Sequence, residues 1–206
     1  MKTLIDVVDY WFEKQKDYKK WFFSGTTLDT YISDNYKDLL DFHLQNNYEY
    51  DMTKSNLKKI LGKIILLDQF SRHVYRNTAK AYDGERFALP MSKGLLESGL
   101  LDFFSTSERI FALMPLQHSE NVEDKQFILN YLDDIENRGF TSETQGHRTE
   151  SLVDTISMLS SFKKHTLNHH HILKTYGRYP KRNEALLRQS NQSELEYLQK
   201  NPNRHF

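Results

Sequence analysis

An acidic and a basic side chain, Asp68 and Arg72, lie four residues apart in the first half of the chain. Asp68 and Arg72 share one face of an expected helix with Leu61, because residues three or four apart meet on one side of a helix. Phe70 belongs to a second apolar face, so we expect this helix to lie between other helices. A buried charge is costly unless it is paired and hydrogen-bonded. Asp68 and Arg72 therefore need partners, which either tie helices together or face a ligand.

A second polar motif, His118-Ser119-Glu120, follows a proline and is expected where one helix ends and the next begins. Imidazole is the side chain best suited to move protons near neutral pH, which makes His118 a candidate for proton transfer. Asp68 or Glu120 would orient it. The alternative interpretation is that Ser119 or Asn121 caps the next helix while His118 binds a carbonyl group.

Basic residues gather in a third motif, at 176–183. Arg178 and Arg182 suit an anionic ligand, because guanidinium groups match the geometry of carboxylates and phosphates. The alternative is that these arginines bind the carbonyl groups at a helix end, or pair with Asp68 and Glu120.

Metal and nucleotide sites are not indicated. His165 and His169 have the four-residue spacing of helical zinc sites, but the glutamate of His-Glu-x-x-His is missing and no third ligand is identifiable nearby. The eight glycines are never closer than five residues apart, which argues against a phosphate-binding loop. We therefore expect no metal ion and no cofactor.

Composition excludes several classes of protein. The chain has 206 residues, with 28 basic and 28 acidic side chains, so it lacks the basic excess of a nucleic-acid binder. It has no cysteine, which excludes disulfides. Asp6 and Asp9 interrupt any signal peptide, and the longest charge-free apolar run, 110–116, is too short to cross a membrane. We expect a cytoplasmic, soluble protein with no nucleic-acid or membrane partner.

Helical periodicity dominates the chain, and we find no alternating pattern that would indicate a strand. A capping box at Ser105-x-x-Glu108 begins one helix, a second box at Ser193-x-x-Glu196 begins the last, and Gly177 ends the longest. The sequence predicts one all-α domain, 1–206, of eight to nine helices in antiparallel hairpins. The longer helices are expected at about 4–12, 28–45, 57–76, 84–97, 105–118, 122–137 (ended by Gly139) and 152–173, with an exposed loop at 141–150.

The order of the three motifs resembles a known family. Leu67-Asp68-Gln69-Phe70-x-Arg72, Met114-Pro115-Leu116-Gln117-His118-Ser119-Glu120 and Tyr176-Gly177-Arg178-Tyr179-Pro180-x-Arg182-Asn183, together with Lys20-Trp21-Phe22 and Asp29, resemble the domain-of-unknown-function family numbered 924. The resemblance covers nearly the whole chain. It implies an all-α, tetratricopeptide-like fold in a largely bacterial family without an established activity. The chain departs from the family pattern at His73, Glu85, Gln117 and His171, and the last two positions lose a carboxylate.

Two functions follow from different interpretations of the motifs. In the first, the polar residues form a pocket for a small anionic ligand and carry out acid–base chemistry. The catalytic candidates are His118, Asp68 and Glu120, and the ligand-binding candidates are Arg72, His169, Arg178, Arg182 and Asn183. In the second, by analogy with tetratricopeptide-like folds, the helices form a scaffold that binds a peptide or protein without catalysis, and the motifs are internal struts.

Overall fold

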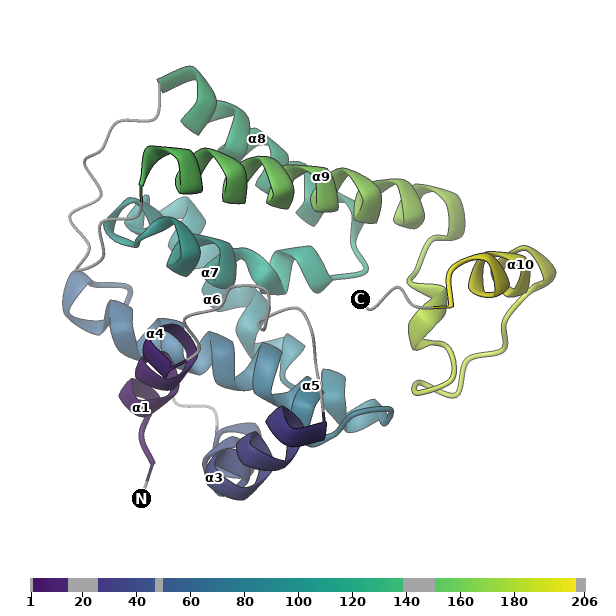
Figure 1. Cartoon of the computed structure of the whole chain (residues 1–206), viewed down its shortest axis with the longest axis horizontal. Coiled ribbons are helices and arrows are strands. Elements are labelled where there is room, and N and C mark those ends of the chain that lie inside the picture. Colours follow the sequence, from purple (N-terminus) through teal and green to yellow (C-terminus); the bar gives the residue numbers. More distant parts are fainter. Residues whose placement is uncertain (1, 15–25, 47–49, 139–150, 203–206) are drawn as a thin grey trace. The chain divides into compact units, whose positions relative to one another are not determined.

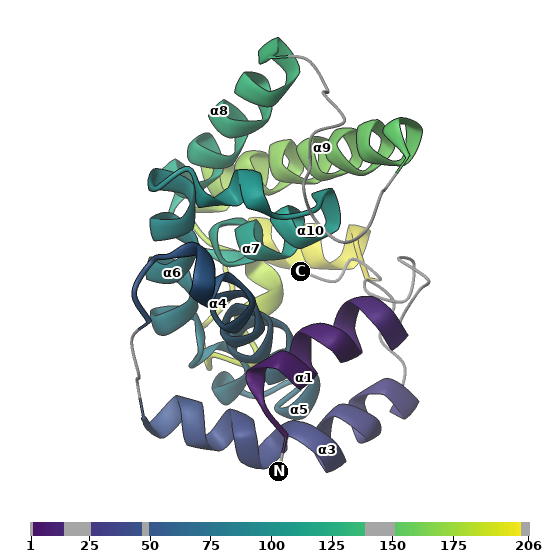
Figure 2. The same ribbon diagram turned by 90° about the vertical axis from the view of Figure 1, so that its left-hand side faces the viewer.

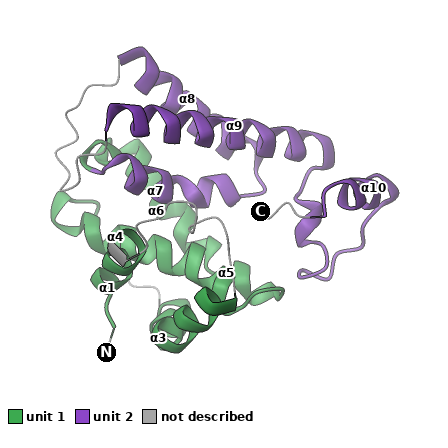
Figure 3. Ribbon diagram, in the orientation of Figure 1, with its two compact units in different colours: residues 1–103 green, residues 104–206 purple. Residues whose placement is uncertain are grey.

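The computed structural model describes residues 2–14, 26–46, 50–138 and 151–202. Within these ranges every regular element is a helix, which confirms the all-α prediction. The chain divides into two compact units, Met1–Phe103 and Phe104–Phe206 (Figure 3), and each is described by itself. The single domain and the tetratricopeptide-like arrangement stay predictions. The motif at 20–22, Gly139 and the expected loop at 141–150 lie outside the described residues.

The first unit is built from helices of very different length. Its elements are α1 (Leu4–Asp9) with the π-helical turn Tyr10–Lys14, α3 (Thr26–Gln45), the 3-10 turn Lys54–Asn56, α4 (Leu57–Ile64), the π-helical turn Ile65–Phe70, α5 (Ser71–Val74), the 3-10 turn Ala79–Tyr82, α6 (Glu85–Glu97) and the 3-10 turn Leu100–Phe103 (Figure 1). The segment from α4 to α5 is the central helix that the sequence predicts at 57–76.

The central helix is buried on both sides, as expected from its two apolar faces. Every residue from Ile64 to Phe70 is buried, and the helix packs against α1, α3 and α6 (Figure 2). Two glycines allow neighbouring backbone segments to approach each other closely. A Cβ at Gly62 would lie 2.2 Å from the carbonyl oxygen of Leu4, and one at Gly84 would lie 2.1 Å from that of Leu67.

The second unit is a three-helix core with a C-terminal extension. Its helices are α7 (Thr106–His118), α8 (Val122–Arg138), α9 (Leu152–Tyr176), the 3-10 turn Pro180–Arg182 and α10 (Gln192–Lys200) (Figure 1). Helix α9 packs against both α7 and α8. Among the described residues, no helix combines the length and apolar character that crossing a membrane requires.

Helix ends test the capping predictions. The Ser105–Glu108 capping box is present, and Gly177 ends α9 with a left-handed φ of 71°. The predicted start of the last helix is wrong by two residues. Asn191, not Ser193, is the N-cap, because its side chain accepts from the amide of Glu194 while the Glu194 carboxylate accepts from the amide of Asn191. Ser193 donates its hydroxyl to the same Asn191 side chain.

Candidate functional site

Asp68 lies in the π-helical turn of the central helix and is completely buried. Its carboxylate accepts from Arg72 Nη2 at 3.0 Å and from Gln69 Nε2 at 2.5 Å. Arg72 Nη2 also donates to Glu85 Oε1 at 2.7 Å, and the guanidinium lies 5.3 Å from the centre of the Tyr82 ring. The buried pair expected from the sequence is therefore present, and Glu85 extends it to a second helix.

One turn further along, His73 and Arg76 share a carboxylate from α3. His73 Nδ1 lies 2.7 Å from Asp29 Oδ1. Arg76 binds the same carboxylate with two nitrogens, Nε and Nη2, each at 2.7 Å. Only 8% of the His73 side chain is exposed. This cluster was not predicted from the sequence. The three-residue spacing of His73 and Arg76 shows that they share a face, but nothing local identifies a partner 44 residues earlier.

The hydrogen bond to Asp29 determines the protonation pattern of His73. An ionised carboxylate only accepts hydrogen bonds, so the short contact with Asp29 assigns the ring proton to Nδ1 and the lone pair to Nε2. The longer approach of Arg76 Nη2 to Nδ1, at 3.4 Å, is then a contact between two donors and not a hydrogen bond. Burial lowers the pKa of His73 and outweighs the raising effect of Asp29. Burial alone would raise the pKa of Asp29, but hydrogen bonds from Arg76 and His73 bring it below its usual value. The arrangement is a neutral imidazole held by an ionised carboxylate.

A third polar cluster surrounds Tyr75 near the end of α5. Its hydroxyl donates to Asp41, and Lys80 Nζ contacts both the Tyr75 hydroxyl, at 2.9 Å, and Asp41, at 3.0 Å. Lys37 also pairs with Asp41. Burial raises the pKa of Asp41, but the hydrogen bonds from Lys37, Tyr75 and Lys80 lower it to about 2. This cluster ties α3 to the end of the central helix.

In the second unit, the end of α7 is held by side chains from α9 and the chain that follows it. The Gln117 carbonyl accepts from Tyr179 Oη at 3.0 Å and from His169 Nδ1 at 3.2 Å. The Gln117 side chain accepts from Thr166 Oγ1 at 3.0 Å. His169 also packs edge-on against the Tyr179 ring, with 5.3 Å between ring centres. Burial is the main cause that lowers the pKa of His169, to about 3.

Two buried cations bind the neighbouring carbonyl groups. Arg182 Nη2 donates to the His118 carbonyl at 2.6 Å, and Lys125 Nζ donates to the carbonyls of Leu116 and Ser119, both at 2.6 Å. The last carbonyls of a helix have no partner within the helix, and a cation there also meets the negative end of the helix dipole. For Arg182 these contacts match the structural alternative given by the sequence.

Glu120 joins the α7–α8 junction to the chain after α9. Its carboxylate accepts from the Tyr179 amide at 2.7 Å and from Arg188 through two nitrogens, at 2.7 and 2.9 Å. Burial raises the pKa of Glu120, but the bonds from Arg188 and Tyr179 lower it below its usual value. Both carboxylate oxygens are therefore engaged within the unit. The Asn121 side chain accepts from the amide of Glu123 at 3.0 Å and so caps the start of α8, in agreement with the capping alternative.

Arg178 and Asn183 bind the C-terminal segment. Arg178 pairs with the buried Glu194 through Nε and Nη2, at 2.7 and 2.9 Å, and donates to the Gln189 carbonyl at 2.8 Å. Asn183 Nδ2 donates to Ser190 Oγ at 3.0 Å. The hydrogen bond from Arg178 is the largest cause that lowers the pKa of Glu194, to about 2. Arg178 thus pairs with Glu194, a partner not predicted from the sequence.

The predicted site residues fall into two groups. Asp68 and Arg72 belong to the first unit, and the others lie together in the second, around the segment 177–183 that we call the strap. These others are His118, Glu120, His169, Arg178, Arg182 and Asn183. Their catalytic and ligand-binding roles stay predictions.

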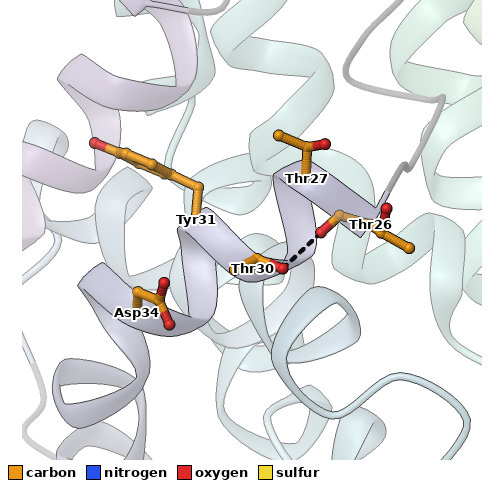
Figure 4. A pocket seen from close by; sticks show the side chains of 5 residues that line it. All are labelled: Thr26, Thr27, Thr30, Tyr31 and Asp34. Atoms are coloured by element: carbon orange, nitrogen blue, oxygen red, sulfur yellow. Dashed lines mark hydrogen bonds between the residues drawn. The ribbon is translucent and has the colours of Figure 1, made fainter.

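A surface pocket lies beside the first turns of α3 (Figure 4). Its described lining consists of Thr26, Thr27, Thr30, Tyr31 and Asp34, and Thr30 donates its hydroxyl to the Thr26 carbonyl at 2.9 Å. None of the predicted site residues belongs to this lining. The Asp34 carboxylate in this lining would repel an anion.

A family model and a solved structure are similar to this chain. The family described as "Bacterial protein of unknown function (DUF924)" matches residues 7–202. The solved structure of a protein of unknown function from Agrobacterium tumefaciens is similar, with a TM-score of 0.68 and 25% identity. The match covers 96% of this chain and 97% of that one. No curated protein matches the sequence.

Proposed function

The chain belongs to the bacterial family of unknown function DUF924, which has no assigned reaction. We propose that the protein binds a small anionic molecule beside His73 and that the His73 side chain transfers a proton. This proposal keeps the ligand class predicted from the sequence and gives the proton-transfer role of His118 to His73. The observation that carries it is the 2.7 Å contact between His73 Nδ1 and Asp29 Oδ1.

The pairing with Asp29 supports a role for His73 in general base catalysis. A carboxylate that accepts from one ring nitrogen fixes the ring and its tautomer, and directs the lone pair to the other nitrogen. A general base must be unprotonated at the working pH, and the lowered pKa of His73 meets that condition near neutrality. Arg76 stabilises the negative charge of Asp29, so the proton stays on the imidazole.

The charges around His73 favour an anion. Arg76 and Arg72 both lower the pKa of His73 through their positive charge. Arg76 uses Nε and Nη2 on Asp29, and its Nη1 has no hydrogen-bond partner among the described residues, while 36% of its side chain is exposed. A bound phosphate or carboxylate would therefore meet a guanidinium donor near the imidazole. Such an anion would raise the pKa of His73, since a nearby negative charge favours the charged imidazolium.

Nitrogen-15 NMR of the histidine rings tests the proposal with inorganic phosphate as the probe. We expect the Nδ1-protonated tautomer for His73 and a saturable rise in its pKa on adding phosphate. Arg76→Gln should abolish the rise. Arg86→Gln is the matched control, because Arg86 is exposed on α6 of the same unit. An Nε2-protonated ring, or a His73 pKa that does not change with phosphate, would contradict the proposal. His73 would then only join α3 to α5.

A binding scaffold without catalysis is the second candidate. The specific observation in its favour is the outward face of α9, where Val153, Leu167 and Ile156 are 76%, 50% and 39% exposed. Large apolar side chains gathered on one exposed face often mark a protein-binding site.

A further inference from the structure

We propose that the outward face of α9 binds an acidic amphipathic helix of another protein. The surface, here called the α9 stripe, consists of Val153, Ile156, Lys164, Leu167, His171 and Lys174. The proposal gives the scaffold candidate its partner and does not depend on the chemistry of His73.

Helical spacing places the stripe on one face. Ser160 lies between Ile156 and Lys164, and each step along the series is three or four residues. The opposite face of α9, which includes Leu159, Phe162 and Ile172, is buried against the rest of its unit. At about 1.5 Å per residue, the stripe is about 31 Å long. That length suits a partner helix of about twenty residues, packed side by side with α9.

The two halves of the stripe differ in chemistry. The N-terminal half presents aliphatic side chains, with Val153 76% exposed. The C-terminal half is basic and is interrupted by one aliphatic residue, Leu167, which is half exposed. A partner helix must therefore offer an apolar ridge together with acidic residues.

The lysines of the stripe are available for a partner. Lys163, which points beside the stripe, already pairs with Asp133 and Glu136 of α8 at 2.7 Å. Lys164 and Lys174 are exposed and form no ion pair with the described residues. Asp154 is the single acidic residue of α9, and its position in the helix lies off the stripe. The stripe therefore carries two lysines and no carboxylate, so its C-terminal half attracts negative charge.

A second copy of the chain fits the stripe poorly. Two α9 helices in parallel would bring lysine against lysine, which is unfavourable. In the antiparallel arrangement, the basic half of one copy would lie on the aliphatic half of the other and leave its lysines without acids. Charge complementarity therefore selects an acidic partner over self-association.

Fluorescence anisotropy with two labelled peptides tests the proposal on the full chain. Both are amphipathic helices of about twenty residues with the same leucine ridge, flanked by glutamates in one and by lysines in the other. We expect the glutamate peptide to bind at least tenfold more tightly, with an affinity that falls as salt is added. Leu167→Glu and Lys164→Glu should each weaken its binding at least tenfold.

Leu195→Glu is the matched control, because Leu195 is 45% exposed on α10, away from the stripe residues in the sequence. It should leave binding unchanged. If the two peptides bound equally well, or if Leu195→Glu weakened binding as much as the stripe variants do, the proposal would be overturned in favour of non-specific hydrophobic binding. Self-association in analytical ultracentrifugation that Leu167→Glu abolishes would overturn it in favour of a second copy. Neither outcome affects the phosphate response of His73, so the two proposals can fail separately.

Discussion

The hydroxyl of Tyr179 donates to the backbone carbonyl of Gln117 at 3.0 Å, across 62 residues of sequence. This bond joins two of the three polar motifs found in the sequence. The same tyrosine donates its amide to Glu120, and its ring lies 5.1 Å from the guanidinium carbon of Arg182. In the second unit the motifs therefore hold each other and fix the strap against the end of α7.

Removing the Tyr179 hydroxyl should weaken this attachment. We expect Tyr179→Phe to lower the free energy of unfolding by about 1 kcal/mol, the typical net contribution of a hydrogen bond. His169 still donates to the same carbonyl, so the loss should not be larger. Urea denaturation followed by circular dichroism measures it. Tyr176→Phe is the control, since no hydrogen bond of its hydroxyl is present among the described residues, and an equal loss there would contradict the prediction.

Mild acid should destabilise the second unit through His169. The unfolded imidazole takes up a proton below about pH 6.5, whereas the folded one does so only near pH 3, because burial lowers its pKa to about 3. The unfolded state therefore binds more protons between these values, and stability falls as the pH is lowered through this window. At about 1.4 kcal/mol per pH unit, His169 alone should cost about 2 kcal/mol at pH 5. Unfolding free energies of the wild type and His169→Gln at pH 7 and pH 5 test this, and equal pH dependence in both proteins would rule it out.

The glycine at the contact of α1 and α4 should not tolerate a methyl group. A Cβ at Gly62 would meet a backbone oxygen of Leu4 at 2.2 Å, so α1 must move. We expect Gly62→Ala to destabilise the protein by about 2 kcal/mol, a typical cost of overpacking. At Gly94 the nearest atom is the flexible end of Met52, at 3.1 Å, so Gly94→Ala should be neutral or stabilising, as alanine is the better helix former. Thermal unfolding compares the pair, and similar melting temperatures would contradict the prediction.

A substitution at Asp68 distinguishes a structural from a functional role of the central helix. Asp68→Ala removes one of the two carboxylates that Arg72 binds and leaves Glu85. Because Glu85 still pairs with Arg72, the loss should stay below the roughly 3 kcal/mol expected for a buried charge left without a partner. We expect this loss in denaturation, with the phosphate response of His73 retained. Asp51→Ala is the exposed control. A normally stable Asp68→Ala protein that no longer responds to phosphate would instead place Asp68 in the ligand site.

Local signals in the sequence located the helices and several of their ends. The spacing of apolar residues gave the central helix, and Gly177 marked the end of α9 because only a left-handed residue fits there. The start of the last helix was predicted two residues late because two capping patterns overlap there, Asn191-x-x-Glu194 and Ser193-x-x-Glu196. In the structure Arg178 also binds the Glu194 carboxylate, a long-range contact that the local pattern does not contain. Long-range pairs left no such signal.

The candidate site shows the same limit. Asp68 could be recognised as needing a partner from its place in an apolar stripe, and Arg72 was the partner within reach of helical spacing. The contact of Asp29 with His73 depends on how α3 lies against α5, which no local pattern encodes. The bond of Arg182 to the His118 carbonyl could be proposed only as one of several options.

The carbonyls of four successive residues, Leu116 to Ser119, accept hydrogen bonds from side chains of α8, α9 and the strap. The strap binds the carbonyls of Gln117 and His118, so it cannot detach without breaking both of these hydrogen bonds at once, and the end of α7 is held while the strap stays in place. The two segments therefore open as one cooperative unit, and their slowest amide protons should exchange with solvent at a common free energy.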